Sequence, residues 1–183
     1  GNVMAFWPDG RRVLLAKSQP QQAWDYYFEA AGPGCTYVLS NRLARDLQEV
    51  LRACREKTSG VALHDWFIYC HARSKGWRWH IDELPGMDYR QHSGNVIGAN
   101  EGSAAARARL DKILSGWYRE QILLIARLCG CEQHSPVKWL QKLQFTDLLQ
   151  LLIRLRRMRR HRSDSLFLGV FFLIMYFRKG WVR

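Results

Sequence analysis

The chain has 183 residues, of which 48% are apolar and 13% aromatic, with eight Trp. This composition supports a full hydrophobic core and excludes an intrinsically disordered protein. The formal net charge of +12 is concentrated late in the chain: residues 119–183 carry 13 Lys and Arg against 4 Asp and Glu, whereas residues 1–118 carry 15 against 12. The five cysteines show no paired spacing that would complete a zinc site, which predicts free thiols in a reducing compartment.

The first third of the chain alternates between loops and short regular elements. Pro8-Asp9-Gly10 predicts a turn between two apolar runs, and residues 21–30 predict a short helix. A strand is expected at 35–39, after the Gly/Pro loop at 32–34. Ser40 or Asn41 is expected to cap a helix over 41–57, whose apolar face consists of Leu43, Leu47, Val50, Leu51 and Cys54.

The middle of the chain continues this alternation. A helix is predicted from Leu63 to Ser74, with Gly76 ending it. "WRWHI" at 77–81 alternates between apolar and polar residues and predicts a strand, and "MDYRQH" at 87–92 predicts another. A long amphipathic helix is expected over 103–129. This order of loops, strands and helices is typical of an α/β fold.

The last fifty residues combine a basic segment with an apolar one. Residues 145–162 predict a helix with six Arg between 154 and 162, and "SLFLGVFFLIMYF" at 165–177 follows with thirteen uncharged residues. A helix needs about 20 apolar residues to cross a bilayer, so this run is too short to span one. Two interpretations stay open: residues 148–183 lie on an anionic membrane surface, or they form a buried helix beside a solvated basic face.

Asp65 is the first candidate for chemistry, because it stands between His64 and Trp66 in an apolar, aromatic stretch, "HDWFIYCHA". In the first turn of a helix, a carboxylate binds free backbone N–H groups and complements the helix dipole. In a partly apolar cleft, the same carboxylate would have a raised pKa and suit a general base. The residues around Asp65 leave both roles open.

Two loops carry the other candidates. "YRQHSGNVIGAN" at 89–100 gathers Arg90, Gln91, His92 and Asn95 at a predicted strand end, where α/β proteins build sites. A cationic Arg and a His suit a diphosphate or its metal ion. Gly34, in "GPGCT" at 32–36, would let the backbone approach a ligand closely. Each loop taken alone is equally consistent with a turn that has no special role.

The order of these segments is more specific than any one of them. "AGPGCTYVLS", then "HDWF" about thirty residues later, then "YRQHSGNVIGAN", resembles the C-terminal part of a family 2 glycosyltransferase. More narrowly, it is similar to the rhamnosyltransferase-like members that build bacterial surface polysaccharides such as O-antigen. The resemblance covers roughly residues 8–130, and "KSQPQQAWDYYFEAAGPGCTY" also reads like a member of this family.

The resemblance implies an α/β fold consisting of a partial GT-A-like (Rossmann-like) layer with a helical C-terminal extension. Residues 1–130 would be the acceptor-side portion of the transferase domain, and 131–183 a basic and apolar helical tail. The implied reaction is the inverting transfer of a sugar, most commonly rhamnose, from a nucleotide-sugar donor to a growing cell-surface polysaccharide or lipid-linked glycan. The implied location is the cytoplasm, peripherally at the inner face of the cytoplasmic membrane.

Site roles follow from the same resemblance. Asp65 falls on the position of the acidic residue that activates the acceptor hydroxyl, with His64 and Trp66 beside it. The neighbouring loop would line the sugar and acceptor side of the cleft through Gly34, Cys35 and Thr36.

The donor side is implied by the third segment. Arg90, Gln91 and Asn95 match a loop that closes over the donor diphosphate, and His92 is implied as a ligand of a divalent Mg or Mn ion. The family's first half is a nucleotide-binding layer that ends in an Asp-x-Asp motif, and these 183 residues contain no Asp-x-Asp. We therefore expect a fragment that lacks the N-terminal half, with a sheet edge or apolar face that another chain or an oligomer covers.

A second function stays open beside sugar transfer. The chain could be a non-enzymatic module that binds a membrane or nucleic acid through its Arg-rich tail, because arginine runs favour phosphate-bearing partners of any kind. The arginines lack the interleaved aromatic residues that single-strand binders use for stacking. The adjacent uncharged run favours a membrane, so nucleic acid is the less expected partner.

Overall fold

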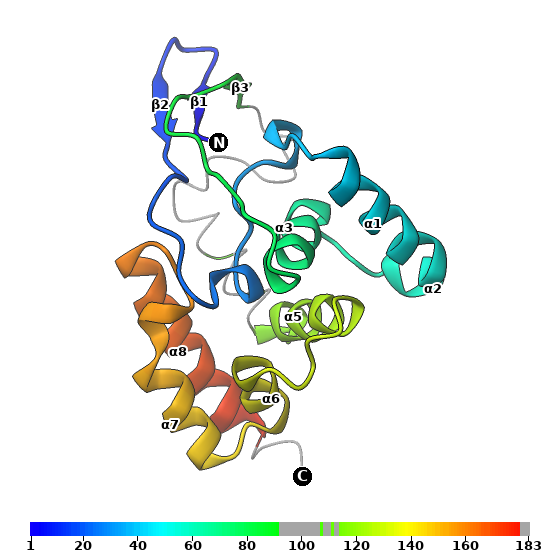
Figure 1. Cartoon of the computed structure of the whole chain (residues 1–183). Coiled ribbons are helices and arrows are strands. Elements are labelled where there is room, and N and C mark those ends of the chain that lie inside the picture. The colour runs from blue at the N-terminus through cyan, green and yellow to red at the C-terminus, as the bar shows by residue number, and fades with distance from the viewer. Residues whose placement is uncertain (92–106, 108–110, 112–113, 180–183) are drawn as a thin grey trace.

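The computed structural model of the chain describes residues 1–91, 107, 111 and 114–179 (Figure 1). A small sheet stands at one end, and helices form the rest of the molecule. In chain order the described helices, 3-10 turns and strands are β1 (Val3–Phe6), β2 (Arg12–Leu15), η1 (Asp25–Tyr27), η2 (Gly34–Thr36), α1 (Asn41–Ala53), α2 (Arg55–Thr58), α3 (His64–Ser74), β3 (Asp88–Arg90), α5 (Trp117–Leu128), α6 (Ser135–Lys142), α7 (Phe145–Ile153), η3 (Leu155–Arg157) and α8 (Arg162–Lys179).

The described sheet has the strand order β2-β1-β3. β1 and β2 form an antiparallel hairpin around the predicted turn, with Phe6 opposite Arg12. β3 pairs with β1 in parallel, with Phe6 opposite Arg90, and the chain between these strands contains the helices α1 to α3. Parallel strands joined through helices are the connection typical of α/β proteins. The mixed α/β class is thus confirmed, whereas a Rossmann-like layer stays a prediction.

The helices α1 and α3 begin where the sequence predicts. Ser40 caps α1, and its hydroxyl accepts the backbone N–H of Leu43 at 3.3 Å. The buried face of α1 is narrower than predicted, because Leu51 is 45% exposed. Gly76 follows α3 with a φ of 78°, a left-handed conformation that commonly ends helices.

The predicted helix over 21–30 and the predicted strand over 35–39 are wrong. Each place holds a single 3-10 turn, η1 or η2. Tyr26, Tyr27 and Phe28 are consecutive and all buried, which a helix with one apolar face cannot achieve. Val38, expected within a strand, is 96% exposed and does not belong to the described sheet.

The predicted strand over 77–81 is also wrong, although its alternation is real. Trp77 and Trp79 are half-buried and Ile81 is buried, whereas Arg78 and His80 are exposed. The segment is not part of the described sheet, and its apolar side chains pack on the core instead. A strand needs a partner with free backbone groups, and alternation alone does not supply one.

Two long predicted helices are interrupted. Within 103–129 the main described helix is α5, which begins at Trp117 after Gly116 with a φ of 83°. The predicted basic helix over 145–162 stops at Ile153, and the chain then turns through η3 before α8 begins at Arg162. The six arginines therefore do not share one helix face.

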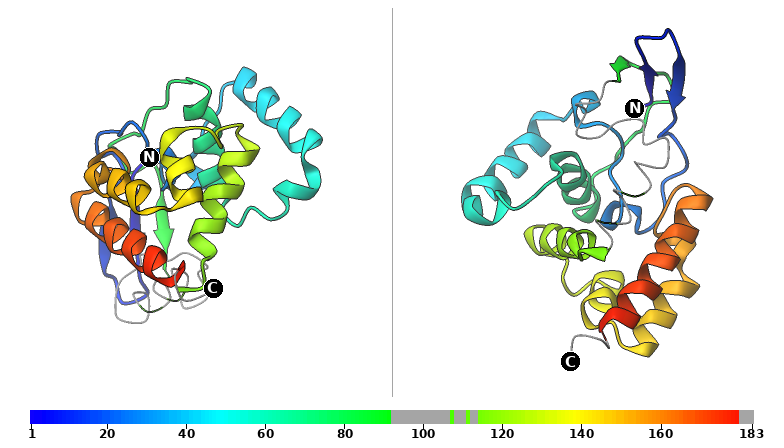
Figure 2. Two further views of the ribbon diagram at one scale, coloured as in Figure 1. Left: turned by 90° about the horizontal axis from the view of Figure 1, so that it is seen from below. Right: turned by 180° about the vertical axis from the view of Figure 1, so that it is seen from behind.

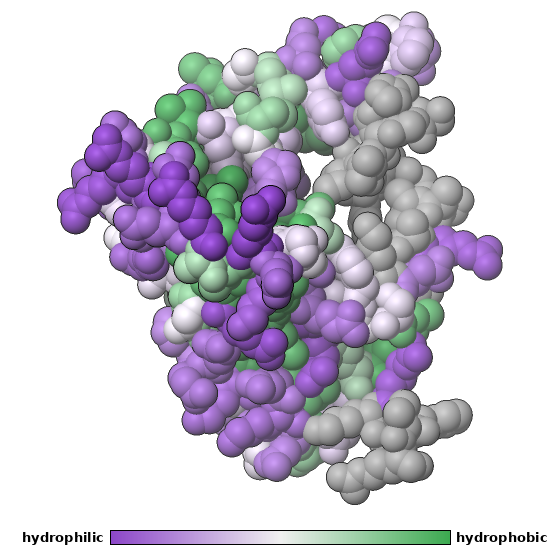
Figure 3. Space-filling view, turned by 90° about the vertical axis from the view of Figure 1, so that its right-hand side faces the viewer, coloured by the Kyte–Doolittle hydropathy of each residue, from purple (hydrophilic) through white to green (hydrophobic). Residues whose placement is uncertain are grey.

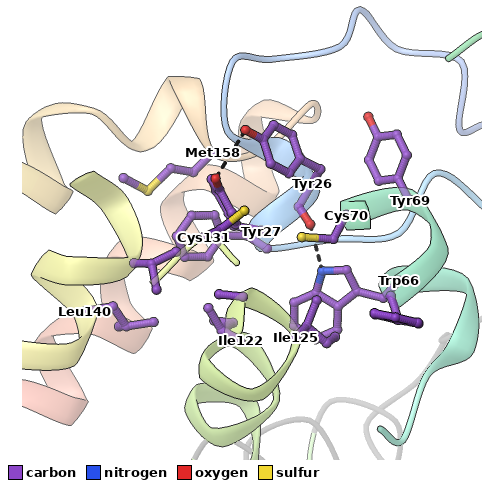
Figure 4. Packing of buried hydrophobic residues seen from close by; sticks show 14 of the residues in the cluster. Tyr26, Tyr27, Trp66, Tyr69, Cys70, Ile122, Ile125, Cys131, Leu140 and Met158 are labelled. Carbon is purple, nitrogen blue, oxygen red and sulfur yellow. Dashed lines mark hydrogen bonds between the residues drawn. The ribbon is translucent and has the colours of Figure 1, made fainter. Parts of the chain in front are cut away.

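One hydrophobic core joins both parts of the chain, as Figure 4 shows from close by. Tyr26 and Tyr27 lie between Trp66 of α3 and the C-terminal residues Leu140 and Met158. Ile122 and Ile125 of α5 close the cluster, each 1% exposed. The boundary predicted at residue 130 falls in the turn between α5 and α6, and residues from both sides of it share this core.

Candidate functional site

Asp65 lies half-buried in the first turn of α3. The backbone N–H of Trp66 donates a hydrogen bond to Asp65 Oδ1 at 2.8 Å, so the carboxylate satisfies one of the free donors at the helix start. Burial raises the pKa of Asp65 above its ordinary value, and this hydrogen bond, His64 and Lys17 partly offset the rise. Asp65 therefore stands in the first turn of α3, as expected, and a raised pKa is what a general base requires; both roles stay predictions.

Gly34 packs directly against this helix end. A Cβ atom on Gly34 would overlap Nε2 of His64 and would lie 3.2 Å from Cβ of Asp65. Only glycine leaves room for the η2 backbone to approach the His64 ring this closely. The structure therefore brings Gly34, His64 and Asp65 together, and their roles in a reaction stay predictions.

The rest of the η2 loop connects α3 with the sheet. The Thr36 hydroxyl donates to the Pro33 carbonyl at 2.8 Å and accepts a hydrogen bond from the Gly1 amine at 3.1 Å. Cys35 is exposed, and its Sγ lies 3.5 Å from Sδ of Met87, just before β3. The three candidate residues of this loop thus occupy a strip between Asp65 and the start of β3.

Trp66 points away from this strip. Its side chain is 2% exposed, and its indole N–H donates to the Tyr26 carbonyl at 3.1 Å (Figure 4). Its ring stacks on that of Tyr118, with the centroids 5.4 Å apart. A direct contact between this ring and a substrate has no support among the described residues. Trp66 instead fixes α3 to the core from behind Asp65.

The donor-side candidates are only partly described. Arg90 is exposed at the end of β3, whereas Gln91 is 3% exposed and continues the sheet, with its backbone N–H donating to the Phe6 carbonyl at 2.8 Å. His92 and Asn95 lie outside the described residues. The roles of His92 and Asn95 at the site therefore stay predictions from the sequence.

The divalent cation that the resemblance implies stays a prediction, because its implied ligand, His92, lies outside the described residues. Nowhere in the described ranges do three His, Cys, Asp or Glu side chains gather as metal ligands would. Mg and Mn sites rely on carboxylates together with phosphate oxygens, and Asp65 is the one carboxylate placed at this helix end. No step of the proposed reaction is therefore assigned to a metal.

Sequence reasoning missed a buried ion-pair network that lies behind the η2 loop. Asp25 is fully buried; the Tyr69 hydroxyl donates to it at 3.0 Å, and the guanidinium groups of Arg73 and Arg160 lie 3.5 and 3.6 Å away. Burial raises the pKa of Asp25, and Arg160 and Arg73 oppose the rise. The sequence feature that could have indicated Asp25 is the one that singled out Asp65, a carboxylate flanked by aromatic residues.

Arg160 clamps the segment that leads into the η2 loop. Its backbone N–H donates to Glu29 Oε1 at 2.7 Å, and its Nη2 donates to the Ala30 carbonyl at 2.6 Å. Because Ala30 is four residues before Gly34, this clamp fixes the start of the loop that packs against His64 and Asp65.

The other arginines of the run are divided between the interior and the surface. Arg154 and Arg157 lie over the rings of Trp139 and Trp24, at 5.3 and 4.2 Å from the centroids. Arg159 Nη1 lies 3.6 Å from Glu29 Oε2, whereas Arg156 and Arg162 are exposed and have no ion pair among the described residues. The arginines of the run therefore do not form one basic helix face.

A separate groove of about 650 Å³ lies between α1 and the end of α3. Figure 3 views the side of the molecule that carries α1, and hydrophilic side chains cover most of it. None of the predicted site residues lines the groove, whose described lining is Asn41, Arg42, Arg45, Asp46, Glu49, Lys75 and Trp77.

Comparison with known proteins supports the resemblance found in the sequence. The chain is 34% identical over 176 residues to the dTDP-rhamnosyl transferase RfbG of Shigella flexneri, a match that covers 96% of this chain and 60% of that protein. No protein-family model matches the chain, and no solved structure matches it. The chain thus spans about three-fifths of the relative's length. Over that length it is similar to a rhamnosyltransferase-like glycosyltransferase.

Proposed function

We propose that this chain forms the acceptor side of an inverting glycosyltransferase, with Asp65 as the general base. The proposed donor is a nucleotide sugar such as dTDP-rhamnose, and the proposed acceptor is a growing cell-surface polysaccharide or lipid-linked glycan. The observation that carries this proposal is the environment of Asp65 in a chain similar to RfbG: the carboxylate is half-buried beside Gly34, and no Lys or Arg among the described residues forms an ion pair with it.

The proposed reaction is a single displacement. Asp65 takes the proton from the acceptor hydroxyl while that oxygen attacks the anomeric carbon of the donor sugar. The bond from this carbon to the diphosphate oxygen breaks, and its electron pair leaves with the nucleotide. Attack from the face opposite the leaving group inverts the configuration. A carboxylate whose pKa is raised by burial is a stronger base than one in water, so the environment of Asp65 favours this role.

The neighbouring residues would position the two substrates. The backbone of Gly34, Cys35 and Thr36 borders Asp65 on the acceptor side. Arg90, exposed at the end of β3, suits the developing charge on the departing diphosphate. The divalent cation, and His92 as its ligand, stay predictions of the resemblance.

The test is transfer from dTDP-rhamnose to lipid-linked glycan extracted from bacterial membranes, followed as dTDP released. Asp65→Asn is expected to lower the rate by about a hundredfold or more, because general-base catalysis typically contributes that much. The matched control is Asp88→Asn, since Asp88 and Arg12 form a surface pair in which both side chains are 53% exposed. Equal rates for Asp65→Asn and the wild type would contradict the proposal.

A binding measurement separates the donor site from the base. Calorimetric titration of dTDP, with Mg²⁺ or Mn²⁺ present, is expected to give the same affinity for the wild type and Asp65→Asn. His92→Ala is expected to weaken the metal-dependent part of this binding. Absence of any dTDP binding would assign the donor site to a part of the transferase outside this chain.

A further inference from the structure

Helix α8 is apolar on two opposite faces. Its inward face is buried in the core through Leu168, Phe171, Phe172 and Met175. Its outward face repeats at three- and four-residue spacing and is between 37% and 72% exposed, through Leu166, Phe167, Val170, Leu173 and Phe177. A helix that is apolar all round is normally covered on every side or lies in lipid.

Helix α7 extends this exposed face. Phe145, Leu149 and Ile153 are spaced by four residues and are 66%, 45% and 66% exposed. The two helices lie side by side in both views of Figure 2. The ring of Tyr176 connects their exposed residues, with its centroid 6.5 Å from that of Phe145 and 5.6 Å from that of Phe177. These eight exposed residues of α7 and α8 form one surface, the α7–α8 face.

Basic residues surround the α7–α8 face. Residues 133–178 contain nine Lys and Arg against two Asp, although Arg159 and Arg160 pair with Glu29 in the interior. Asp147 is occupied as part of a capping box, in which its carboxylate accepts the Gln144 N–H at 3.1 Å. Arg156 and Arg162 are exposed at the turn between the two helices, and Arg178 is exposed near the far end of α8. The margins of the apolar face are therefore cationic.

We propose that the α7–α8 face docks on an anionic lipid membrane, with both helices lying in the plane of the interface. An apolar stripe with cationic margins fits acyl chains below and anionic headgroups around it. No helix in the described part of the chain combines the length and apolarity that crossing a bilayer demands. A second copy of the chain would bring the same cationic margins together, which like-charge repulsion opposes. The proposal is independent of sugar transfer.

The test is flotation of the whole chain with vesicles of phosphatidylcholine, with or without phosphatidylglycerol. Binding is expected on the anionic vesicles and is expected to fall with added salt. Replacing both aromatic residues, Phe167→Gln with Phe177→Gln, is expected to weaken binding about a hundredfold, because each ring loses its burial in lipid. Both rings are exposed, so the thermal unfolding temperature of the variant should match the wild type.

Two control variants make the result specific. Leu84→Gln changes an apolar side chain that is 74% exposed outside the α7–α8 face, and it should leave binding unchanged. Arg156→Gln with Arg162→Gln should reduce the preference for phosphatidylglycerol. The proposal is overturned if the wild type binds neither vesicle or if the two Phe substitutions leave binding unchanged. It is also overturned if sedimentation shows a dimer that these Phe substitutions dissociate.

Discussion

Asp25 and Asp65 stand in similar aromatic stretches of sequence but in different surroundings. Asp25 is fully buried and contacts Tyr69, Arg73 and Arg160. Asp65 is half-buried, accepts the N–H of the next residue, and borders an exposed histidine and a glycine loop. Burial raises the pKa of both carboxyls, so the shift alone does not distinguish them.

The difference lies in what each carboxylate can still do. The hydrogen bonds and guanidinium contacts of Asp25 are internal, so it holds η1 against α3 and the C-terminal turn. Asp65 has no guanidinium partner among the described residues and remains accessible at a helix end. The carboxylate of Asp25, paired with two guanidinium groups, stabilises the fold. The carboxylate of Asp65, half-exposed and without a cationic partner among the described residues, can accept a proton from a substrate.

The comparison is tested most strongly from the Asp25 side. Arg160→Met removes the buried guanidinium that pairs with Asp25 and Glu29. The variant is expected to lower the free energy of unfolding by about 3–5 kcal/mol, because an unpaired buried carboxylate is left behind. Arg156→Met, in the same turn but exposed, is expected to change it by less than about 0.5 kcal/mol. Urea unfolding of both variants is the measurement. Similar losses for the two would show that the network contributes little.

A smaller effect is expected on the Asp65 side. Gly34→Ala places a methyl group against the His64 ring, which is exposed and can swing away. We expect a loss of about 1 kcal/mol in unfolding free energy. The displaced ring lies beside the proposed base, so transfer should slow by about tenfold. Adding His64→Ala should restore the stability. If the loss persists in the double variant, the overlap with the His64 ring is not its cause.

The smallest expected effect is a pH dependence. The folded state raises the pKa of Asp65 above 3.8, so its ionised form destabilises the fold at neutral pH. Asp65→Asn keeps an oxygen acceptor for the Trp66 N–H and removes that charge. The variant should therefore be slightly more stable than the wild type at neutral pH. The difference should vanish as the pH falls through the folded pKa and below 3.8, where the carboxyl is neutral in both states. Urea midpoints across this range measure it, and a constant difference would contradict the assignment.

Features that depend on neighbouring residues could be predicted from the sequence. The first hairpin, the Ser40 cap and the bounds of α3 all follow from turn residues, capping residues and periodicity within a few positions. The resemblance implied that Gly34 and Asp65 lie on the acceptor side of one cleft. The sequence could not show why residue 34 is a glycine. The structure shows that a Cβ atom there would overlap the His64 ring.

Features that depend on distant partners could not be predicted. The alternation at 77–81 was correct, but the segment is not paired with any strand in the part of the chain that the structure describes. The arginine run resembled a solvated face because Glu29, the partner of Arg160, lies 131 residues earlier. Trp66 was expected at the substrate because it stands beside Asp65 in the family-like segment. The helix α3 buries residues on more than one side, and the sequence does not show which side faces the core.

The most direct test of the central claim measures Asp65→Asn and Asp25→Asn together, by transfer from dTDP-rhamnose and by urea unfolding. The account predicts opposite outcomes. Asp65→Asn should be at least as resistant to urea as the wild type and lose about a hundredfold or more in transfer rate. Asp25→Asn should unfold at lower urea, and its folded population should transfer sugar at close to the wild-type rate. A fully active Asp65→Asn that binds dTDP normally would contradict the assignment of Asp65 as the base.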